Sequence, residues 1–554
     1  MKQINGLAAA TGFAKGIVVT AEVKEQSVKR QSLDEIKKEC ILQTEQLYEK
    51  TCLELGEESG KIFKAYLALL EDPCLYESVE EHLKNGRELA EALEHGFEEN
   101  AAIFDSMKNE YMQQRAEDIR ALKKMHLECL NGQKKVFHIP DGDQPYIVAA
   151  DELTPVDTMK LDQKRLAGLI TKFGGATSHV VILAKTLGIP AIIGVKDLEE
   201  IHESDIIFLD GEKGVITVCP DEGTRIDWEN GYQNWMKQKE IMNHLQPGPV
   251  YTEDGTQVHI SVNIGGSKDI ADMDFSSLYG IGLYRTEFLF TDLEKKPDVE
   301  AQRKEYQKVF DKVGNKDLII RTLDIGGDKQ ISYLDLPKEE NPFLGCRGVR
   351  LCLKERFLFE EQLEALVRAS NGKSFSIMFP MVDVLEEFLE AKQLLKKVCD
   401  KLRKEGCVVS RDIKTGIMVE TPAAAICIDQ FMSNVDFVSI GTNDLTQYIM
   451  AADRGNASLN TLQTIYQPAV VRMICHVIQT CQKHNVKVSV CGEAGSDPKY
   501  LKLMIGMGLR YVSVSKSLVN QARYSVLQTS VSEMENKVEQ VLQASKVAEI
   551  RKLI

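Results

Sequence analysis

Apolar positions in the first 220 residues follow two different rhythms. From residue 33 to about 130 they recur every three or four positions, as at Leu33, Ile36, Cys40 and Leu47, which is the spacing of amphipathic helices. Short runs rich in β-branched residues predict strands at 15–20, 145–150, 168–172, 191–195 and 206–209. The last of these and the strand after GEKG predict a hairpin. The pattern predicts an α/β domain, residues 1–22 and 142–220, interrupted by a helical domain at 23–141.

Residues 250–554 repeat the order of apolar strand, polar loop and amphipathic helix. We expect eight strands there, at 258–263, 280–285, 318–323, 376–380, 416–420, 437–443, 488–492 and 511–514. Eight strands separated by helices predict a (β/α)8 (TIM) barrel, and an open doubly wound sheet is the alternative. Before the barrel, a polar helical stretch that ends at Pro247-Gly248-Pro249 predicts a linker over 221–249.

Composition narrows the class of protein. A chain of 554 residues with 43% apolar and 27% charged residues is typical of a globular protein of several domains. No apolar run has the length of a membrane span, and the first residues lack the layout of an export signal, so we expect no membrane insertion. The thirteen cysteines include no CxxC pair, which argues against a zinc or disulfide framework and favours the reducing cytoplasm. The net charge of −15 argues against a general nucleic-acid binder.

Acidic side chains outnumber basic ones in the helical insert. This surplus has two interpretations, which are a solvated helical surface and a docking face for a basic protein partner.

Polar residues gather at the carboxyl ends of the expected barrel strands, where the loops of such a barrel form one mouth. The strand ends and the loops after them contain four arginines, three carboxylates, an amide and a thiol: Arg285, Arg321, Arg347, Arg454, Glu420, Asp444, Glu493, Asn443 and Cys491. The planar fork of arginine matches phosphate and carboxylate oxygens. Glu420 and Asp444 supply hard oxygens for a magnesium ion that also binds substrate phosphate. Any single arginine fits a surface salt bridge, but the whole set predicts a site for a small, multiply charged anion with Mg²⁺.

Cys491 has two interpretations of its own. A cysteine that closes an apolar strand is commonly a small buried hydrophobe. At a barrel mouth beside cations, its thiol is also suited to donate or accept a proton.

His179 lies where a glycine pair runs into an apolar helix. Thr177 or Ser178 can cap that helix, and Gly188 can end it. His179 then lies in the first turn, where free backbone N–H groups and the helix dipole favour an anion. We interpret His179 as a covalent carrier of phosphate. A partly exposed histidine without a chemical role is the alternative.

Long motifs along nearly the whole chain carry a family resemblance. They are GLAAATGFAKG, YLALLEDP, RAEDIRALKK, DELTPVDT, GGATSH, GIPAIIG, GIGLYRTEFLF, RTLDIGGDK, EENPFLGCRGVR, MFPMV, GIMVETPAAA, SIGTNDLTQY and DRGN. With these motifs the sequence resembles Enzyme I of the phosphoenolpyruvate-dependent sugar phosphotransferase system, the phosphoenolpyruvate–protein phosphotransferases. GG-x-TSH is shared with related dikinases, but those need an ATP-grasp domain, for which this chain has no candidate segment.

The resemblance implies a two-step transfer. The phosphoryl group of phosphoenolpyruvate would pass to Nε2 of His179, which Thr158 hydrogen-bonds, and then to a histidine of the phosphocarrier protein HPr, docked on the helical insert. The α/β domain would swing about a hinge near 221–249, and the barrel would form a homodimer. The resemblance also implies that Arg285 and Arg321 clamp the phosphate, and that Arg347, Asn443 and Arg454 make further substrate contacts. It implies that Glu420 and Asp444 are magnesium ligands, and that the thiol of Cys491 protonates the enolate carbon.

Three features depart from the family's common residues, namely Ala176, Lys185 and the segment CGEAGSD at 491–497. They bear on carrier preference and rate, since the catalytic residue types are intact. The alternatives to a standard family member are a paralogue serving a specialised carrier, a catalytically idle metabolite-sensing regulator, and a lyase-like barrel enzyme that does not use His179.

Overall fold

The computed structural model describes residues 2–25, 32–55, 57–106, 110–174, 179–291, 295–326, 333–334, 339–453, 456, 459 and 461–554. The chain divides into two compact units, Met1–Lys239 and Glu240–Ile554. Within the described ranges, no helix has the length and apolar character needed to cross a membrane.

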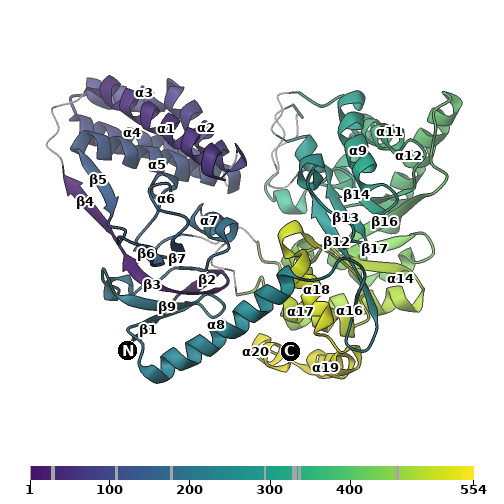
Figure 1. The fold of residues 1–554 in the computed structure, drawn as a ribbon. Helices are drawn as coiled ribbons and strands as arrows, with labels where there is room; N and C mark the ends of the chain where they lie inside the picture. Colours follow the sequence, from purple (N-terminus) through teal and green to yellow (C-terminus); the bar gives the residue numbers. More distant parts are fainter. Residues whose placement is uncertain are drawn as a thin grey trace. The chain divides into compact units, whose positions relative to one another are not determined.

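The first unit is built on an eight-stranded mixed sheet (Figure 1). Its strands are β1 (Lys2–Asn5), β2 (Leu7–Ala10), β3 (Phe13–Val19), β6 (Tyr146–Ala150), β7 (Leu166–Thr171), β8 (Ala191–Ile193), β9 (Ile206–Asp210) and β10 (Val215–Val218). They lie in the order β1-β10-β9-β3-β6-β7-β8-β2, with β3, β6, β7 and β8 mutually parallel. β9 and β10 form the antiparallel hairpin that the sequence predicts. Strands from both ends of the first 220 residues therefore share one sheet.

In the described residues between β3 and β6, five helices interrupt this sheet. They are α1 (Leu33–Leu55), α2 (Glu57–Glu71), α3 (Cys74–Lys84), α4 (Leu89–Ser106) and α5 (Glu110–Asn131). Their apolar faces meet in a core of their own that includes Phe63, Tyr66 and Phe97. The chain enters and leaves through a two-stranded antiparallel ribbon, β4 (Ala21–Glu25) and β5 (Gln133–Phe137). The helical periodicity of the sequence thus corresponds to an inserted helical bundle.

A long polar helix, α8 (Glu222–Asn243), follows the hairpin, as the polar stretch of the sequence predicts. Trp228 is the residue of this helix that is buried, and its indole N–H donates to the Leu209 carbonyl at 3.0 Å. Its ring stacks on Tyr232 at 5.2 Å and meets Phe13 edge-on at 6.0 Å. One aromatic contact area therefore attaches α8 to the sheet of the first unit.

The second unit is a closed parallel barrel. Its strands are β12 (Gln257–Ile264), β13 (Gly280–Arg285), β14 (Asp317–Arg321), β15 (Phe375–Phe379), β16 (Ile413–Val419), β17 (Phe437–Ile440), β18 (Lys487–Val490) and β19 (Tyr511–Ser515). Each pairs in parallel with the next, and β19 pairs with β12 from His259↔Tyr511 to Asn263↔Ser515. A short strand, β11 (Val250–Tyr251), adds antiparallel to β12. This closure confirms the predicted TIM barrel and excludes the open doubly wound sheet.

Helices surround the barrel and bury the outward-facing side chains of its strands. They are α9 (Val299–Val313), α10 (Val349–Lys354), α11 (Arg356–Ser370), α12 (Leu385–Lys404), α13 (Pro422–Ile426), α14 (Ile428–Phe431), α15 (Thr442–Met450), α16 (Pro468–Lys483), α17 (Pro498–Gly506), α18 (Val519–Leu527), α19 (Val531–Gln543) and α20 (Val547–Leu553). Inside the barrel a separate cluster packs below its carboxyl-terminal mouth: Leu283, Ile319, Met378, Met418, Phe437 and Cys491. This layer forms the floor on which the candidate site is built.

Candidate functional site

His179 is the first residue of α7 (His179–Leu187), the position that the sequence predicts. Gly174 before it has a φ of +123°, a backbone conformation that glycine tolerates, and Gly188 after it ends the helix with a φ of +66°. Val180 and Ala184 bury the apolar face of α7 against the sheet. The proposed caps at 177 and 178, Ala176 and the side chain of His179 lie outside the described part of the chain, so their contacts stay predictions.

Thr158 lies at the end of α6 (Pro155–Thr158), a short helix that packs next to α7. Thr154 caps α6 through a reciprocal pair of hydrogen bonds with Asp157. Lys135 and Lys160 hold the Asp157 carboxylate at 3.2 and 3.4 Å. The hydroxyl of Thr158 is buried and donates to the Pro155 carbonyl at 2.7 Å. Its oxygen can still accept a hydrogen bond, and the bond to His179 remains a prediction.

Arg321 ends β14 and lies within a buried cluster of acids. Its guanidinium donates to Glu287 at 2.6 Å and contacts Asp324 at 2.9 Å. Glu287 lies in η3 (Thr286–Leu289), directly after β13, and both acids are buried. Burial opposes the charge of Arg321, but the nearby carboxylates outweigh it and raise the pKa of the guanidinium above its ordinary value. Two acids therefore hold Arg321 charged and in place.

Arg347 bridges two acids across the mouth. Its guanidinium lies 3.3 Å from Asp324 and 3.3 Å from Asp444, and it also donates to the Tyr448 hydroxyl at 3.3 Å. The loop after β14 approaches Arg347 closely at Gly326, where φ is +107° and an added Cβ would lie 2.6 Å from the Cβ of Arg347. Glycine at 326 thus allows the loop to pack on the arginine.

Glu420 follows β16 and is 1% exposed. Its carboxylate accepts a hydrogen bond from the Met381 N–H at 2.7 Å. Burial, together with the carboxylates of Asp444 and Asp324, raises the pKa of Glu420 to about 8. The fold therefore brings the carboxylates of Glu420 and Asp444 close enough to repel each other, where a cation would stabilise their charges, and their role as magnesium ligands stays a prediction.

Asn443 follows β17 and Cys491 follows β18, and both contribute to contacts between the ends of these two strands. The side-chain oxygen of Asn443 accepts from the Glu493 N–H at 3.1 Å. The Cys491 thiol is buried, and its sulfur lies 3.7 Å from the Ile440 carbonyl oxygen. Burial raises the pKa of Cys491 to about 11, although Ser439 and Arg321 partly oppose this shift. The thiol is thus held in its protonated form at neutral pH.

Among the described arginines of the mouth, Arg285 is the exposed one. It ends β13 in register with Arg321 of β14, and its guanidinium carbon lies 5.4 Å from the centre of the Phe288 ring. Arg454 lies outside the described residues. Arg321 and Arg347 are therefore held mainly by acids, whereas the side chain of Arg285 reaches solvent.

The described mouth carries three arginines and five carboxylates: Arg285, Arg321 and Arg347; Glu287, Asp324, Glu420, Asp444 and Glu493. Among the described residues no group of three or more His, Cys, Asp or Glu is arranged to hold a metal ion. Two carboxylates are nevertheless a sufficient protein contribution for Mg²⁺, which keeps waters and binds substrate phosphate. The surplus of acids over arginines fits a cation beside Glu420 and Asp444.

Two acids of this cluster, Glu287 and Asp324, were not predicted as site residues. Each follows a strand-end arginine by two or three positions, in GLYRTE and RTLD. That spacing could have identified both acids as site residues, because residues just after parallel barrel strands lie at the same mouth.

Two of the three features that depart from the family's common residues, Lys185 and the segment 491–497, lie in the described part of the chain. Lys185 lies in the last turn of α7 and is exposed. Asp497, at the end of CGEAGSD, caps α17 by accepting from the N–H groups of Lys499 and Tyr500, both at 3.0 Å, and accepts from the Tyr466 hydroxyl at 2.8 Å. The altered segment thus keeps a complete helix cap at its last residue.

Three family models match the chain. Residues 5–115 match the N-terminal domain of PEP-utilising enzymes, residues 142–214 match their mobile domain, and residues 239–531 match their PEP-binding domain.

Several similar proteins share the name phosphoenolpyruvate-protein phosphotransferase. That of Priestia megaterium is 37% identical over 99% of this chain and 98% of its own length. That of Listeria innocua serovar 6a is 36% identical over 100% of this chain and 99% of its own length. That of Staphylococcus carnosus is 38% identical over 90% of this chain and 88% of its own length. The similarity extends along almost the whole of each protein.

Proposed function

Because this chain belongs to the phosphoenolpyruvate–protein phosphotransferase family, we propose that it transfers the phosphoryl group of phosphoenolpyruvate first to His179 and then to a histidine of HPr. The transfer to protein histidine follows from the family. The observation that carries the residue assignment is the barrel mouth, where arginines, acids and a protonated thiol gather beneath the loops. The proposed divisions are 1–22 and 142–220 for the phosphohistidine domain, 23–141 for carrier docking, 221–249 for the hinge and 250–554 for the donor site.

The arginines have separate tasks in this proposal. Arg285 is exposed and can meet the incoming phosphate, while Arg321 and Arg347 are preset by Glu287, Asp324 and Asp444. Arg321 and Arg347 are thus held in place as donors before substrate binds, with their Nε atoms buried and without a partner in the described part of the chain. Fixed donors of this kind stabilise charge on the transferring phosphoryl oxygens without reorganising. Asn443 and Arg454 would complete the substrate contacts.

Glu420 and Asp444 would hold magnesium. When bound, the ion supplies positive charge that neutralises the phosphate and carboxylate of the substrate. Glu420 suits this task because burial and neighbouring acids destabilise its charge until a cation arrives.

Cys491 would complete the first half-reaction. Attack by the imidazole nitrogen forms a P–N bond as the P–O bond to the enol oxygen breaks, and the electron pair stays on the enolate. Cys491 then gives its proton to the enolate carbon and pyruvate leaves; the thiolate recovers a proton from solvent. A thiol whose burial raises its pKa to about 11 still holds its proton at neutral pH and can donate it.

The second half-reaction needs His179 to meet another protein. His179 belongs to the first compact unit and the donor residues to the second, so transfer requires the units to approach each other during the cycle. The helical insert would dock HPr, because its acidic surplus suits a basic partner. We expect a homodimer formed through the barrel. We also expect activity in the cytoplasm, because all thirteen cysteines are free thiols.

The test is the coupled reaction of the full chain. With phosphoenolpyruvate, Mg²⁺ and HPr, the wild-type protein should release pyruvate continuously, and His179→Ala should stay at background. A panel of purified carrier proteins, each offered to the phosphorylated chain, identifies the acceptor. No pyruvate from the wild-type chain would favour an idle regulator, and pyruvate from His179→Ala would favour a barrel enzyme that does not use this histidine.

A further inference from the structure

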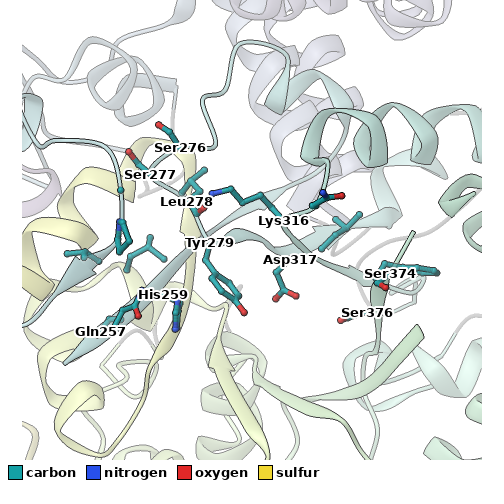
Figure 2. Close-up of a pocket in the computed structure, with 18 of the residues that line it drawn as sticks. Gln257, His259, Ser276, Ser277, Leu278, Tyr279, Lys316, Asp317, Ser374 and Ser376 are labelled. Atoms are coloured by element: carbon teal, nitrogen blue, oxygen red, sulfur yellow. Dashed lines mark hydrogen bonds between the residues drawn. The ribbon is translucent and has the colours of Figure 1, made fainter. Parts of the chain in front are cut away.

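A cavity of about 450 Å³ opens at the amino-terminal end of the barrel (Figure 2). It is lined by the first residues of β12 to β16 and the loops before them, so it lies at the end of the strands opposite the arginine and acid mouth. On β14, Asp317 borders the cavity and Arg321 lies in the mouth, four residues and about 13 Å apart. A volume of this size is sufficient for a small metabolite.

One wall of the cavity is aromatic. His259 and Tyr279 line it, with ring centres 4.4 Å apart, and Tyr511 stacks behind His259 at 4.6 Å. Burial and the nearby Lys487 lower the pKa of His259, which keeps its imidazole neutral. The wall therefore offers ring surface and a neutral hydrogen-bonding group.

The charge around the cavity is positive, although the whole chain carries −15. Arg523 is 4% exposed and donates to three backbone carbonyls, those of Gln246, Gly248 and Ser277, with no carboxylate beside it in the described part of the chain. Burial lowers its pKa, and no acid offsets that effect. A buried cation without a counterion is costly, and an anion in the cavity would relieve that cost.

Lysines add to this charge. Lys316 and Lys414 both line the cavity and are exposed. Lys316 uses one donor on the Leu278 carbonyl at 2.7 Å, which leaves others for a ligand. The Asp317 carboxylate is already neutralised by Lys487 at 2.6 Å. Asp412 is the other acid of the lining, so cations outnumber uncompensated acids.

Hydroxyl groups complete the lining: Ser276, Ser277, Ser374 and Ser376, which Figure 2 shows on both sides of Tyr279. We propose that this cavity binds a phosphate monoester carried on a hydroxylated ring, such as a sugar phosphate or a nucleoside monophosphate. The cations take the phosphate, the serines take ring hydroxyls, and the ring lies against His259 and Tyr279. The site is separate from the proposed phosphotransfer and does not depend on it.

Calorimetric titration of the full chain tests this. The probes are glucose 6-phosphate, ribose 5-phosphate, AMP, inorganic phosphate and glucose. We expect at least one ester to bind, about tenfold or more tighter than phosphate or glucose alone. AMP against ribose 5-phosphate distinguishes a nucleotide from a sugar phosphate. Binding by none of the esters, or phosphate binding as tightly as they do, overturns the proposal.

Variants locate the binding. Lys414→Glu reverses an exposed charge, and Ser374→Trp fills the rim; each should weaken ester binding about tenfold or more. Lys404→Glu reverses the charge of another exposed lysine, on α12 and outside the lining; it is the matched control and should bind as wild type. Arg285→Ala should lose pyruvate formation but keep ester binding. If Arg285→Ala abolishes the binding, or both cavity variants bind as wild type, the ester does not occupy this cavity.

Discussion

Asp324 provides a quantitative test of how the mouth is held together, because it lies between two buried arginines. Replacing it with asparagine keeps the shape but removes the charge that faces Arg321 at 2.9 Å and Arg347 at 3.3 Å. Removing one partner of a buried ion pair costs about 3–5 kcal/mol. Removing the charge of Asp324 also relieves its repulsion of the Glu420 carboxylate. This gain is small at neutral pH, because the pKa of Glu420, about 8, keeps that acid largely protonated. We therefore expect about 3 kcal/mol of destabilisation for Asp324→Asn, the lower limit, because the amide oxygen can still accept hydrogen bonds.

Differential scanning calorimetry of the full chain measures this cost. In a unit of this size, Glu240–Ile554, about 3 kcal/mol corresponds to a fall in Tm of roughly 4–5 °C. Asp311→Asn is the matched control, since Asp311 pairs with Lys373 at 3.1 Å but its side chain is 64% exposed. Such a surface pair contributes about 0–1 kcal/mol. If Asp324→Asn lowers Tm no more than Asp311→Asn, the acids do not hold the arginines and this reasoning is wrong.

Three further predictions follow from burial and backbone geometry. Burial lowers the pKa of His126, in the helical insert, from 6.5 to about 4. Its contribution to the free energy of unfolding is therefore complete above pH 6.5 and declines by about 3 kcal/mol toward pH 4, because the unfolded imidazole binds a proton that the folded one does not. Urea titrations followed by circular dichroism should show this loss of stability, and a flat profile would contradict it. Cys491→Ala should slow pyruvate release on the order of a hundredfold while phosphoenolpyruvate still labels the protein; unchanged pyruvate release in a steady-state assay would assign Cys491 to packing. Gly326→Ala places a Cβ 2.6 Å from that of Arg347 and should raise the KM for phosphoenolpyruvate roughly tenfold; an unchanged KM would show that the loop does not position the arginine.

The regular parts of the fold were predictable because their side-chain patterns are strong. All eight barrel strands lie within a few residues of the predicted ranges, since strands buried on both faces are continuous apolar runs. The short edge strands β1, β2 and β11, and the ribbon of β4 and β5, were not predicted. Sequences such as KQIN and VY carry no periodicity, and their pairing depends on partners far along the chain.

The candidate site was predictable in its parts but not in its pairing. The strand ends identified Arg321, Glu420 and Cys491, because parallel strands bring their carboxyl ends to one mouth. The sequence indicated arginines available to substrate, whereas Glu287 and Asp324 hold Arg321 and Arg347. Such pairing follows from loop geometry, which one sequence does not encode in a local pattern.

The cavity at the other end of the barrel gave no signal in the sequence. Its lining comes from separate strands and from Arg523 near the end of the chain. None of these residues forms a local motif, so only the closed barrel brings them together.

Phosphate on His179 tests the central claim most directly. The full chain is incubated with phosphoenolpyruvate and Mg²⁺, digested under alkaline conditions that preserve phosphohistidine, and mapped by mass spectrometry. We expect one phosphoryl group on the peptide that contains His179 and none in His179→Ala. An absent adduct, or one on another side chain, would contradict the account.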